Sequence, residues 1–258
     1  MINVFATAKS GMSAYQTKLD HLSNDLVNAS TTGYKSVDVG FKDLLTETLD
    51  RKGVPLENKD AINGTGVRIG TEYRNNTQGN LLTTGRKTDL ALDGKGYFAA
   101  MQADGTMAYT RDGNFAVDSN GVLVDSSGNK VYIEYTNGAS EGMPQLSADN
   151  LSIDSNGGIS MMMDNQIVEI GRIPVFTAVG SRAFLAIGSN YFVPSSDAVV
   201  TECNANDYDI RQGFLESSNV DTADTLTSVI LTQRAFELSS KAITVADDLW
   251  GLINSMKS

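Results

Sequence analysis

The chain has 258 residues, of which 20 are basic and 31 are acidic, so its formal net charge is −11. Acidic side chains outnumber basic ones at both ends and in the middle, and no basic cluster appears. Binding to a phosphate backbone or to an anionic membrane needs clustered Lys and Arg, so the composition argues against nucleic acid and membrane as partners.

No targeting or membrane-spanning segment is visible. The N-terminus lacks a charged stretch followed by an apolar run of signal-peptide length, and no segment approaches the ~20 apolar residues of a membrane span. We therefore expect a cytoplasmic protein, or one exported without a cleaved signal. Cys203 is the only cysteine and cannot form an intramolecular disulfide, so we expect a partly buried small residue there.

Apolar residues near the N-terminus recur alternately every three and four positions. This alternation is the seam of a coiled coil, because two helices share a contact face only when apolar residues return about every 3.5 positions. The helix is predicted to begin near Ile2 and to end within residues 28–33, where polar residues and Gly33 follow. The seam residues are Phe5, Ala8, Met12, Tyr15, Leu19, Leu22, Leu26 and Ala29.

His21, the only histidine, falls two positions after Leu19 and is expected to face solvent. A Ser-His-Asp triad could use no other histidine, and a site of several histidines is impossible. Paired carboxylates could arise by chance among 31 acids, so a β-rich hydrolase stays an alternative without positive support. Neither a Gly-x-Ser-x-Gly motif nor a phosphate-binding loop is present.

Residues 36–77 are predicted to be a linker or extended arm, and residues 51–66 within them are polar and Gly-rich. Residues 78–210 read as an antiparallel β domain, because short β-branched and aromatic runs alternate with Asp-Gly and Asn-Gly turns every 8–12 residues or so. The predicted strands include Leu90–Leu92, Tyr97–Ala99, Met107–Thr110, Asn114–Val117, Val122–Val124, Lys130–Ile133, Leu151–Ile153, Ile167–Ile170, Pro174–Phe176 and Tyr191–Val193.

Two Asp-Ser-Asn-Gly stretches, which begin at Asp118 and Asp154, resemble fragments of a calcium loop. Neither has the further ligands or the closing Glu that an EF-hand loop requires. The sequence therefore predicts turns at both places, with no metal and no cofactor.

The C-terminal segment repeats the alternating pattern and adds a wider apolar face. The helix is predicted to begin near Ser218 and Asn219, with Asp221 and Asp224 placed to complement the helix dipole. Its seam residues are Leu231, Ala235, Leu238, Ala242, Val245, Leu249, Leu252 and Met256. Further apolar residues widen the face to an arc of ~160°, which one partner helix cannot cover; these are Val229, Phe236, Ile243, Ala246, Trp250 and Ile253.

Four motifs resemble those of the flagellar basal-body rod and hook proteins. They occur in the family's order and cover about half of the chain. The stretches are LSNDLVNASTTGYK at 22–35, QGNLLTTGRKTDLALDGKGYF at 78–98, YTRDGNFAVDSNGVLV at 109–124, and QGFLESSNVDTADTLTSVILTQRAFELSSKAITVADDL at 212–249. The length resembles that of the distal rod members or of the similar-sized proximal rod relative.

The periodic ends and the turn-rich middle predict an α+β fold in which long terminal helices, within 1–35 and 211–258, pair as a coiled coil around an inserted, mainly antiparallel β domain. The resemblance implies a structural subunit of the rod, a hollow axial drive shaft joining motor to hook, whose inner tube the terminal helices form and which has no catalytic activity. The implied location is the basal body, reached through the type III export apparatus, and the implied partners are copies of itself and other rod and hook subunits. The alternatives are a hook-type axial subunit and a surface binding module built on the β domain.

The assembly interface is expected on the apolar faces of the two helices. Its residues are Phe5, Met12, Tyr15, Leu19, Leu22, Leu26, Leu231, Phe236, Leu238, Ile243, Val245, Leu249, Trp250 and Leu252.

Overall fold

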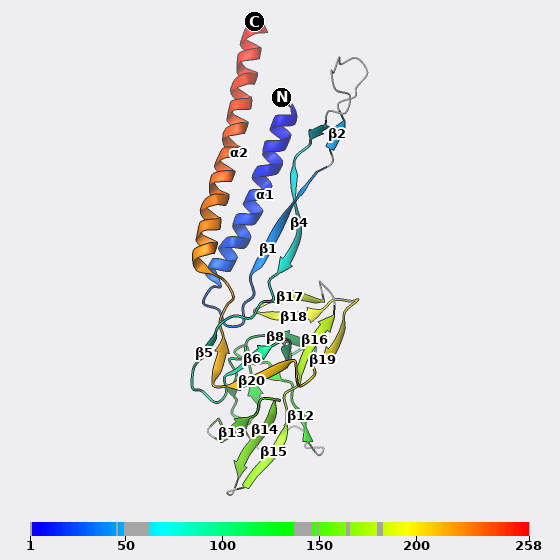
Figure 1. Ribbon diagram of the computed structural model, residues 1–258, viewed down its shortest axis with the longest axis vertical. Coiled ribbons are helices and arrows are strands. Elements are labelled where there is room, and N and C mark those ends of the chain that lie inside the picture. The colour runs from blue at the N-terminus through cyan, green and yellow to red at the C-terminus, as the bar shows by residue number, and fades with distance from the viewer. Residues whose placement is uncertain are drawn as a thin grey trace. The chain divides into compact units, whose positions relative to one another are not determined.

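The computed structural model describes residues 2–44, 46–48, 62–136, 146–148, 150–163, 166–179 and 183–257. The chain divides into two compact units (Figure 1). The helical unit comprises Met1–Ala29, Ser36–Asn76 and Val220–Ser258, and the β unit comprises Ser30–Lys35 and Thr77–Asn219. The prediction of an α+β chain is confirmed, and every strand pairing in the described residues is antiparallel.

The helical unit contains two long helices and a narrow β hairpin (Figure 1). Its elements are α1 (Ile2–Val27), β1 (Val37–Asp43), β2 (Thr46–Thr48), β3 (Ile62–Gly64), β4 (Val67–Arg74) and α2 (Thr222–Lys257). β1 pairs with β4, and β2 pairs with β3. The region predicted as a linker or arm thus contains four strands, while its polar stretch at 51–61 lies outside the described residues. No described helix is long and apolar enough to cross a membrane.

α1 packs against the β hairpin on one side. The Tyr15 and Phe41 rings meet edge to face with centroids 5.4 Å apart, and Asp25 accepts a hydrogen bond from the Val37 N–H at 3.2 Å. His21 is partly buried, with its Nε2 3.4 Å from a Glu72 carboxylate oxygen, so the prediction of a solvent-facing side chain is wrong. The heptad repeat of α1 indicates a partner helix, but it does not indicate that the hairpin of β1 and β4, which follows in the chain, also packs against α1.

α2 begins at Thr222, three residues later than the predicted Asn219. Asp221 is its N-cap, because its Oδ1 accepts hydrogen bonds from the N–H groups of Ala223 at 2.9 Å and Asp224 at 3.1 Å. Those donors have no partner within the first turn of the helix. The side chain of Asn219 instead donates to the Thr77 carbonyl in the β unit.

The β unit is built from seventeen described strands. They are β5 (Leu81–Thr83), β6 (Leu90–Gly94), β7 (Tyr97–Met101), β8 (Met107–Thr110), β9 (Ala116–Val117), β10 (Leu123–Val124), β11 (Lys130–Val131), β12 (Glu134–Tyr135), β13 (Leu151–Ile153), β14 (Gly158–Met163), β15 (Gln166–Arg172), β16 (Val175–Val179), β17 (Phe184–Gly188), β18 (Tyr191–Pro194), β19 (Val199–Glu202), β20 (Tyr208–Gln212) and β21 (Phe214–Glu216).

Two larger sheets and two strand pairs make up this unit (Figure 1). Nine strands form one sheet in the order β17-β18-β8-β7-β11-β10-β9, in which β16 also pairs with β7 and with β19. The second sheet has the order β12-β15-β14-β13. β6 pairs with β20 and β5 with β21, so the beginning and the end of the inserted domain are joined to each other. Its core includes fully buried Leu90, Leu92, Phe98, Ile159 and Val175.

The Asp-Ser-Asn-Gly stretches are hairpin turns. Asp118 Oδ1 accepts hydrogen bonds from the N–H groups of Asn120 and Val122, and Asp154 Oδ1 accepts from those of Asn156 and Gly158. The carboxylates are occupied by their own loops, which is the behaviour of an Asx turn.

Replacing Asp118 with alanine is expected to lower the urea midpoint slightly and to leave it insensitive to added calcium. The hydrogen bond from Val122 is the main reason why the pKa of Asp118 lies below its ordinary value of 3.8. The stabilisation is therefore complete above that ordinary value and is lost as the pH falls through the lowered pKa. The midpoints of the wild type and Asp118→Ala should converge in acid. A calcium-dependent difference between them at neutral pH would contradict the turn assignment.

Candidate assembly interface

Small residues lie in the contact between α1 and α2. The two helices run side by side in Figure 1, and they pack against each other within the helical unit. The buried small residues of the two helices are Ala8, Gly11 and Ala14 on α1 and Thr232 and Ala246 on α2. A Cβ built on Gly11 would lie 3.6 Å from Ser239 Oγ, which fixes the register of the pair. Small residues let the two helix backbones approach closely.

Three buried or half-buried small residues of α2, spaced seven positions apart, each directly follow a large apolar residue that is exposed. Leu231 precedes Thr232, Leu238 precedes Ser239, and Val245 precedes Ala246. Successive side chains on a helix are turned by about 100°, so the large residues point away from α1. Together with three residues further along they form the outer stripe, whose exposed fractions are 46–86 %; its members are Leu231, Leu238, Val245, Leu249, Leu252 and Met256.

The predicted seam of the C-terminal helix is therefore wrong as an intramolecular contact. Ala235 and Ala242 are partly buried, but the six large seam residues of α2 are exposed in the single chain. Two sets of residues on this helix recur about every 3.5 positions, one large and apolar and the other small. A prediction from hydrophobicity chooses the large set as the contact face. Packing against α1 uses the small set instead.

The remaining predicted interface residues divide between the two environments. Partly buried are Met12, Tyr15, Leu19, Leu22, Leu26, Phe236 and Ile243. Exposed are Phe5 and Trp250.

α2 is longer than α1 by ten residues (36 − 26), or about 15 Å at 1.5 Å per residue. With Gly11 beside Ser239 and the helices antiparallel, the last residues of α2 extend past the start of α1. Trp250 and Ile253 lie on the same side of α2 as Ser239, yet both are about half exposed. About half of the apolar surface of these two side chains is therefore left uncovered in the single chain.

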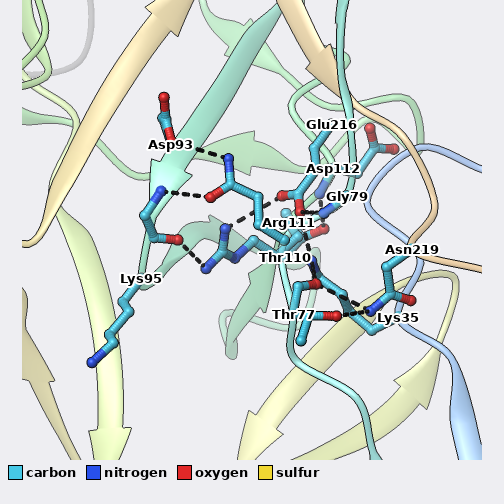
Figure 2. A network of polar contacts seen from close by, with 12 residues as sticks. Lys35, Thr77, Gly79, Asp93, Lys95, Thr110, Arg111, Asp112, Glu216 and Asn219 are labelled. Atoms are coloured by element: carbon cyan, nitrogen blue, oxygen red, sulfur yellow. Dashed lines mark hydrogen bonds and ion pairs between the residues drawn. The ribbon is translucent and has the colours of Figure 1, made fainter.

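A second constellation, not expected from the sequence, lies in the β unit. Figure 2 shows a buried ion cluster centred on Glu216 of β21. Glu216 Oε1 accepts from Lys35 Nζ at 2.5 Å and from the Gly79 N–H at 2.9 Å, and its Oε2 lies 3.3 Å from Arg111 Nη1. The three charged side chains are almost inaccessible to water. One carboxylate thus balances two cations in the protein interior.

Each member of the ion cluster has a further bond that fixes its direction. Lys35 Nζ donates to the Thr77 carbonyl at 2.8 Å, and Arg111 Nη2 donates to the Gly94 carbonyl at 2.8 Å. The main-chain carbonyl of Glu216 accepts from the Gly33 N–H at 2.8 Å. Burial lowers the pKa of Lys35, and the hydrogen bond and negative charge of Glu216 oppose that shift.

The ion cluster joins all four of the sequence motifs singled out above. Lys35 ends the first, Gly79 lies in the second, Arg111 in the third and Glu216 in the fourth. The only sign of the ion cluster in the sequence is that charged residues occur within these motifs. Their spacing does not show that the charged side chains come together.

Substitution of Gly113, in the third motif, is expected to disrupt the packing of that motif against β6. A Cβ there would lie 1.6 Å from the Leu90 carbonyl oxygen, which is backbone and cannot rotate away. Gly113→Ala should destabilise the β unit by about 3 kcal/mol or more, the upper end of the range for overpacking. The control is Gly105→Ala, where φ is +83° but the space is open, with an expected cost of about 1–2 kcal/mol. Urea unfolding should show this order, and equal costs would contradict the close contact.

Two family models match this chain. One describes the D1 domain of the flagellar hook protein FlgE/F/G and matches residues 91–161, and the other describes the C-terminal region of the flagellar basal-body rod FlgEFG proteins and matches residues 211–256.

Curated relatives match over their whole length. The chain is 34 % identical to the flagellar basal-body rod protein FlgG of Borreliella burgdorferi, over 100 % of this chain and 99 % of the relative. It is 34 % identical to FlgG of Bacillus subtilis, over 96 % and 97 % of the two chains. It is also 30 % identical to the flagellar hook-basal body complex protein FlhP of Bacillus subtilis, over 100 % of both.

Proposed function

Since the chain belongs to the flagellar basal-body rod protein family and is a structural subunit of the basal body rather than an enzyme, we propose that it assembles through its two terminal helices. The observation that supports this most directly is the outer stripe, which keeps six large apolar side chains in water on a well-formed helix. Burying one such side chain is worth roughly 1.5–3 kcal/mol. A second helix laid on the stripe would gain several such contributions.

We propose further that α1 and α2 pair as a coiled coil, with the face of small residues turned inward and the outer stripe turned to neighbours. The inner and outer surfaces of the helix pair are unlike each other. A surface that fits a different surface on the next copy gives an open, head-to-tail polymer instead of a closed dimer. The predicted interface residues that belong to the outer stripe would then contact other copies, while those on α1 mainly support the pair; the former are Leu231, Leu238, Val245, Leu249 and Leu252.

The partners in this proposal are copies of the chain and other rod and hook subunits, and the product is a hollow axial drive shaft between motor and hook. Export through the type III apparatus without a cleaved signal is part of the same proposal. Full-length similarity to basal-body rod proteins supports a position in the rod, and within the rod we propose the distal segment, with a similar-sized proximal rod position as the alternative.

Electron microscopy of basal bodies from a strain that lacks this gene tests the proposal. We expect rods that end early and carry no hook, and expression of the wild-type chain should restore them. Complete basal bodies with hooks in the deletion strain would overturn the rod assignment and favour a surface module built on the β unit.

A further inference from the structure

The nine-stranded sheet contains a path of six strands with an open strand at each end. The path runs β17-β18-β8-β7-β16-β19, and each neighbouring pair is antiparallel. Among the described residues β17 pairs only with β18, and β19 pairs only with β16. The outer edge of each end strand therefore presents backbone N–H and C=O groups that no described strand uses.

β17 lacks the usual protection of an edge strand. Leu185 and Ile187 are 51 % and 49 % exposed, and the strand carries neither a charge nor a proline. Its one protective feature is a register shift between Ala186 and Gly188. At the other end, Val199 of β19 is 68 % exposed. Exposed apolar edges of this kind favour addition of a further strand.

The charge distribution indicates which strand would be added. Residues 183–196 are 14 consecutive residues without a charged side chain, the longest such run in a chain of net charge −11. A second copy carries the same negative charge, so repulsion between copies is least where this run meets its neighbour. Glu202, at the end of β19, is already paired with Arg172, so β19 adds little uncompensated charge to the contact.

Strand direction is compatible with pairing between identical copies. The six strands alternate in direction, so the first and the last run in opposite directions. When two copies have the same orientation, β19 of one is antiparallel to β17 of the next, and the alternation continues. Such a contact is head-to-tail and does not close on itself.

We propose that β17 of one copy pairs with β19 of a second copy in the assembled rod, joining the β units into a continuous sheet. This inference rests on the proposed function, because it requires assembled copies. A strand pair of four or five residues is far smaller than the ~1,200 Å² of a stable interface, so it supplements the helix contacts and fixes the register between copies.

Cross-linking between two differently marked copies tests the contact. A strain would express Ile187→Cys and Val199→Cys chains together, and its basal bodies would be treated with a short bis-maleimide spanning the roughly 5–8 Å between opposite or diagonal positions. We expect a cross-linked dimer from the mixture and none from either variant alone. The wild type is the control, since its Cys203 is buried. A product from Ile187→Cys alone would mean that β17 pairs with itself, and no product from the mixture would mean that the strands do not meet; either result overturns the proposal.

A charge placed on the open edge gives an independent test. Ile187→Lys should reduce swimming and the yield of complete rods, because lysine on an edge strand opposes strand addition. The matched control is Ile167→Lys on β15, which is 75 % exposed but lies between β12 and β14, and we expect wild-type swimming from it. Equal swimming by the two variants would overturn the strand pairing and leave the rod assignment intact, since that depends on the deletion strain.

Discussion

Leu238→Asp is expected to prevent incorporation of the chain into the rod while leaving both units folded. Leu238 is 66 % exposed in the single chain and makes no intramolecular core contact that the substitution would remove. In an assembly that covers the outer stripe, the variant loses the roughly 1.5–3 kcal/mol of a buried leucine and must also bury a carboxylate without a partner. The loss recurs at every copy along the polymer.

The measurements are swimming in soft agar, electron microscopy of basal bodies, and far-UV circular dichroism of the purified chain. We expect no swimming, no complete rods and a wild-type spectrum. Thr244→Asp is the matched control, because it adds the same charge at an exposed position of α2 that is turned well away from Leu238. Normal swimming by Leu238→Asp would contradict the role of the outer stripe.

A second variant separates the outer stripe from the helix pair. Ser239→Leu puts a large side chain against Gly11, where a Cβ would already lie 3.6 Å from the serine oxygen. It should loosen the contact between α1 and α2 in the single chain, so that hydrogen exchange across α1 becomes faster. Leu238→Asp should leave that exchange unchanged, although the two residues are adjacent.

Glu216→Gln is expected to cause the largest loss of stability in the β unit. The substitution keeps the shape of the side chain but removes the negative charge that pairs with Lys35 and Arg111 in the interior. Removing one partner from a buried ion pair typically costs 3–5 kcal/mol, a large share of the ~5–15 kcal/mol that holds an ordinary domain folded. The control is Asp209→Asn, whose partner Arg211 is 3.9 Å away and about half exposed, with an expected cost of at most about 1 kcal/mol.

Cys203 supplies a readout that is specific to the β unit. It is the only cysteine, it is 8 % exposed in the β core, and burial raises the pKa of its thiol. Its labelling by a thiol reagent therefore reports opening of this unit. Labelling of Glu216→Gln should be faster than that of Asp209→Asn at the same urea concentration, and equal rates would contradict the role of the ion cluster.

The pH dependence gives a further check on Glu216→Gln. Without the carboxylate, the pKa of Lys35 loses the two contributions that oppose its lowering by burial. Between the lowered pKa of the folded chain and the ordinary value of 10.5, the unfolded chain binds more protons than the folded chain, and this pH range is wider in the variant. The stability of the variant should therefore rise with pH across that range. Loss of stability across the same range would contradict this account of Lys35.

The family, the helical character of both ends and most strands of the β unit could be predicted from the amino-acid sequence. Helix periodicity and Asp-Gly or Asn-Gly turns depend on neighbouring residues, so they can be recognised without a structure. The strand runs beginning at Leu90, Tyr97, Met107 and Leu151 were found for this reason. The turns at Asp118 and Asp154 were predicted from their Asn-Gly pairs and from the missing calcium ligands, and in the structure each carboxylate bonds to its own loop.

The face of α2 that packs against α1 could not be predicted without the folded chain. Two sets of residues on that helix have the same repeat. Ser239, and not Leu238, faces α1 because the close approach to Gly11 favours a small side chain. The structure alone also brought Lys35, Arg111 and Glu216 together from positions up to 181 residues apart. Contacts of such long range depend on the pairing of the first and last strands of the β unit, which no local pattern encodes. The outer stripe can be recognised as an exposed apolar surface only after the contact between α1 and α2 is known.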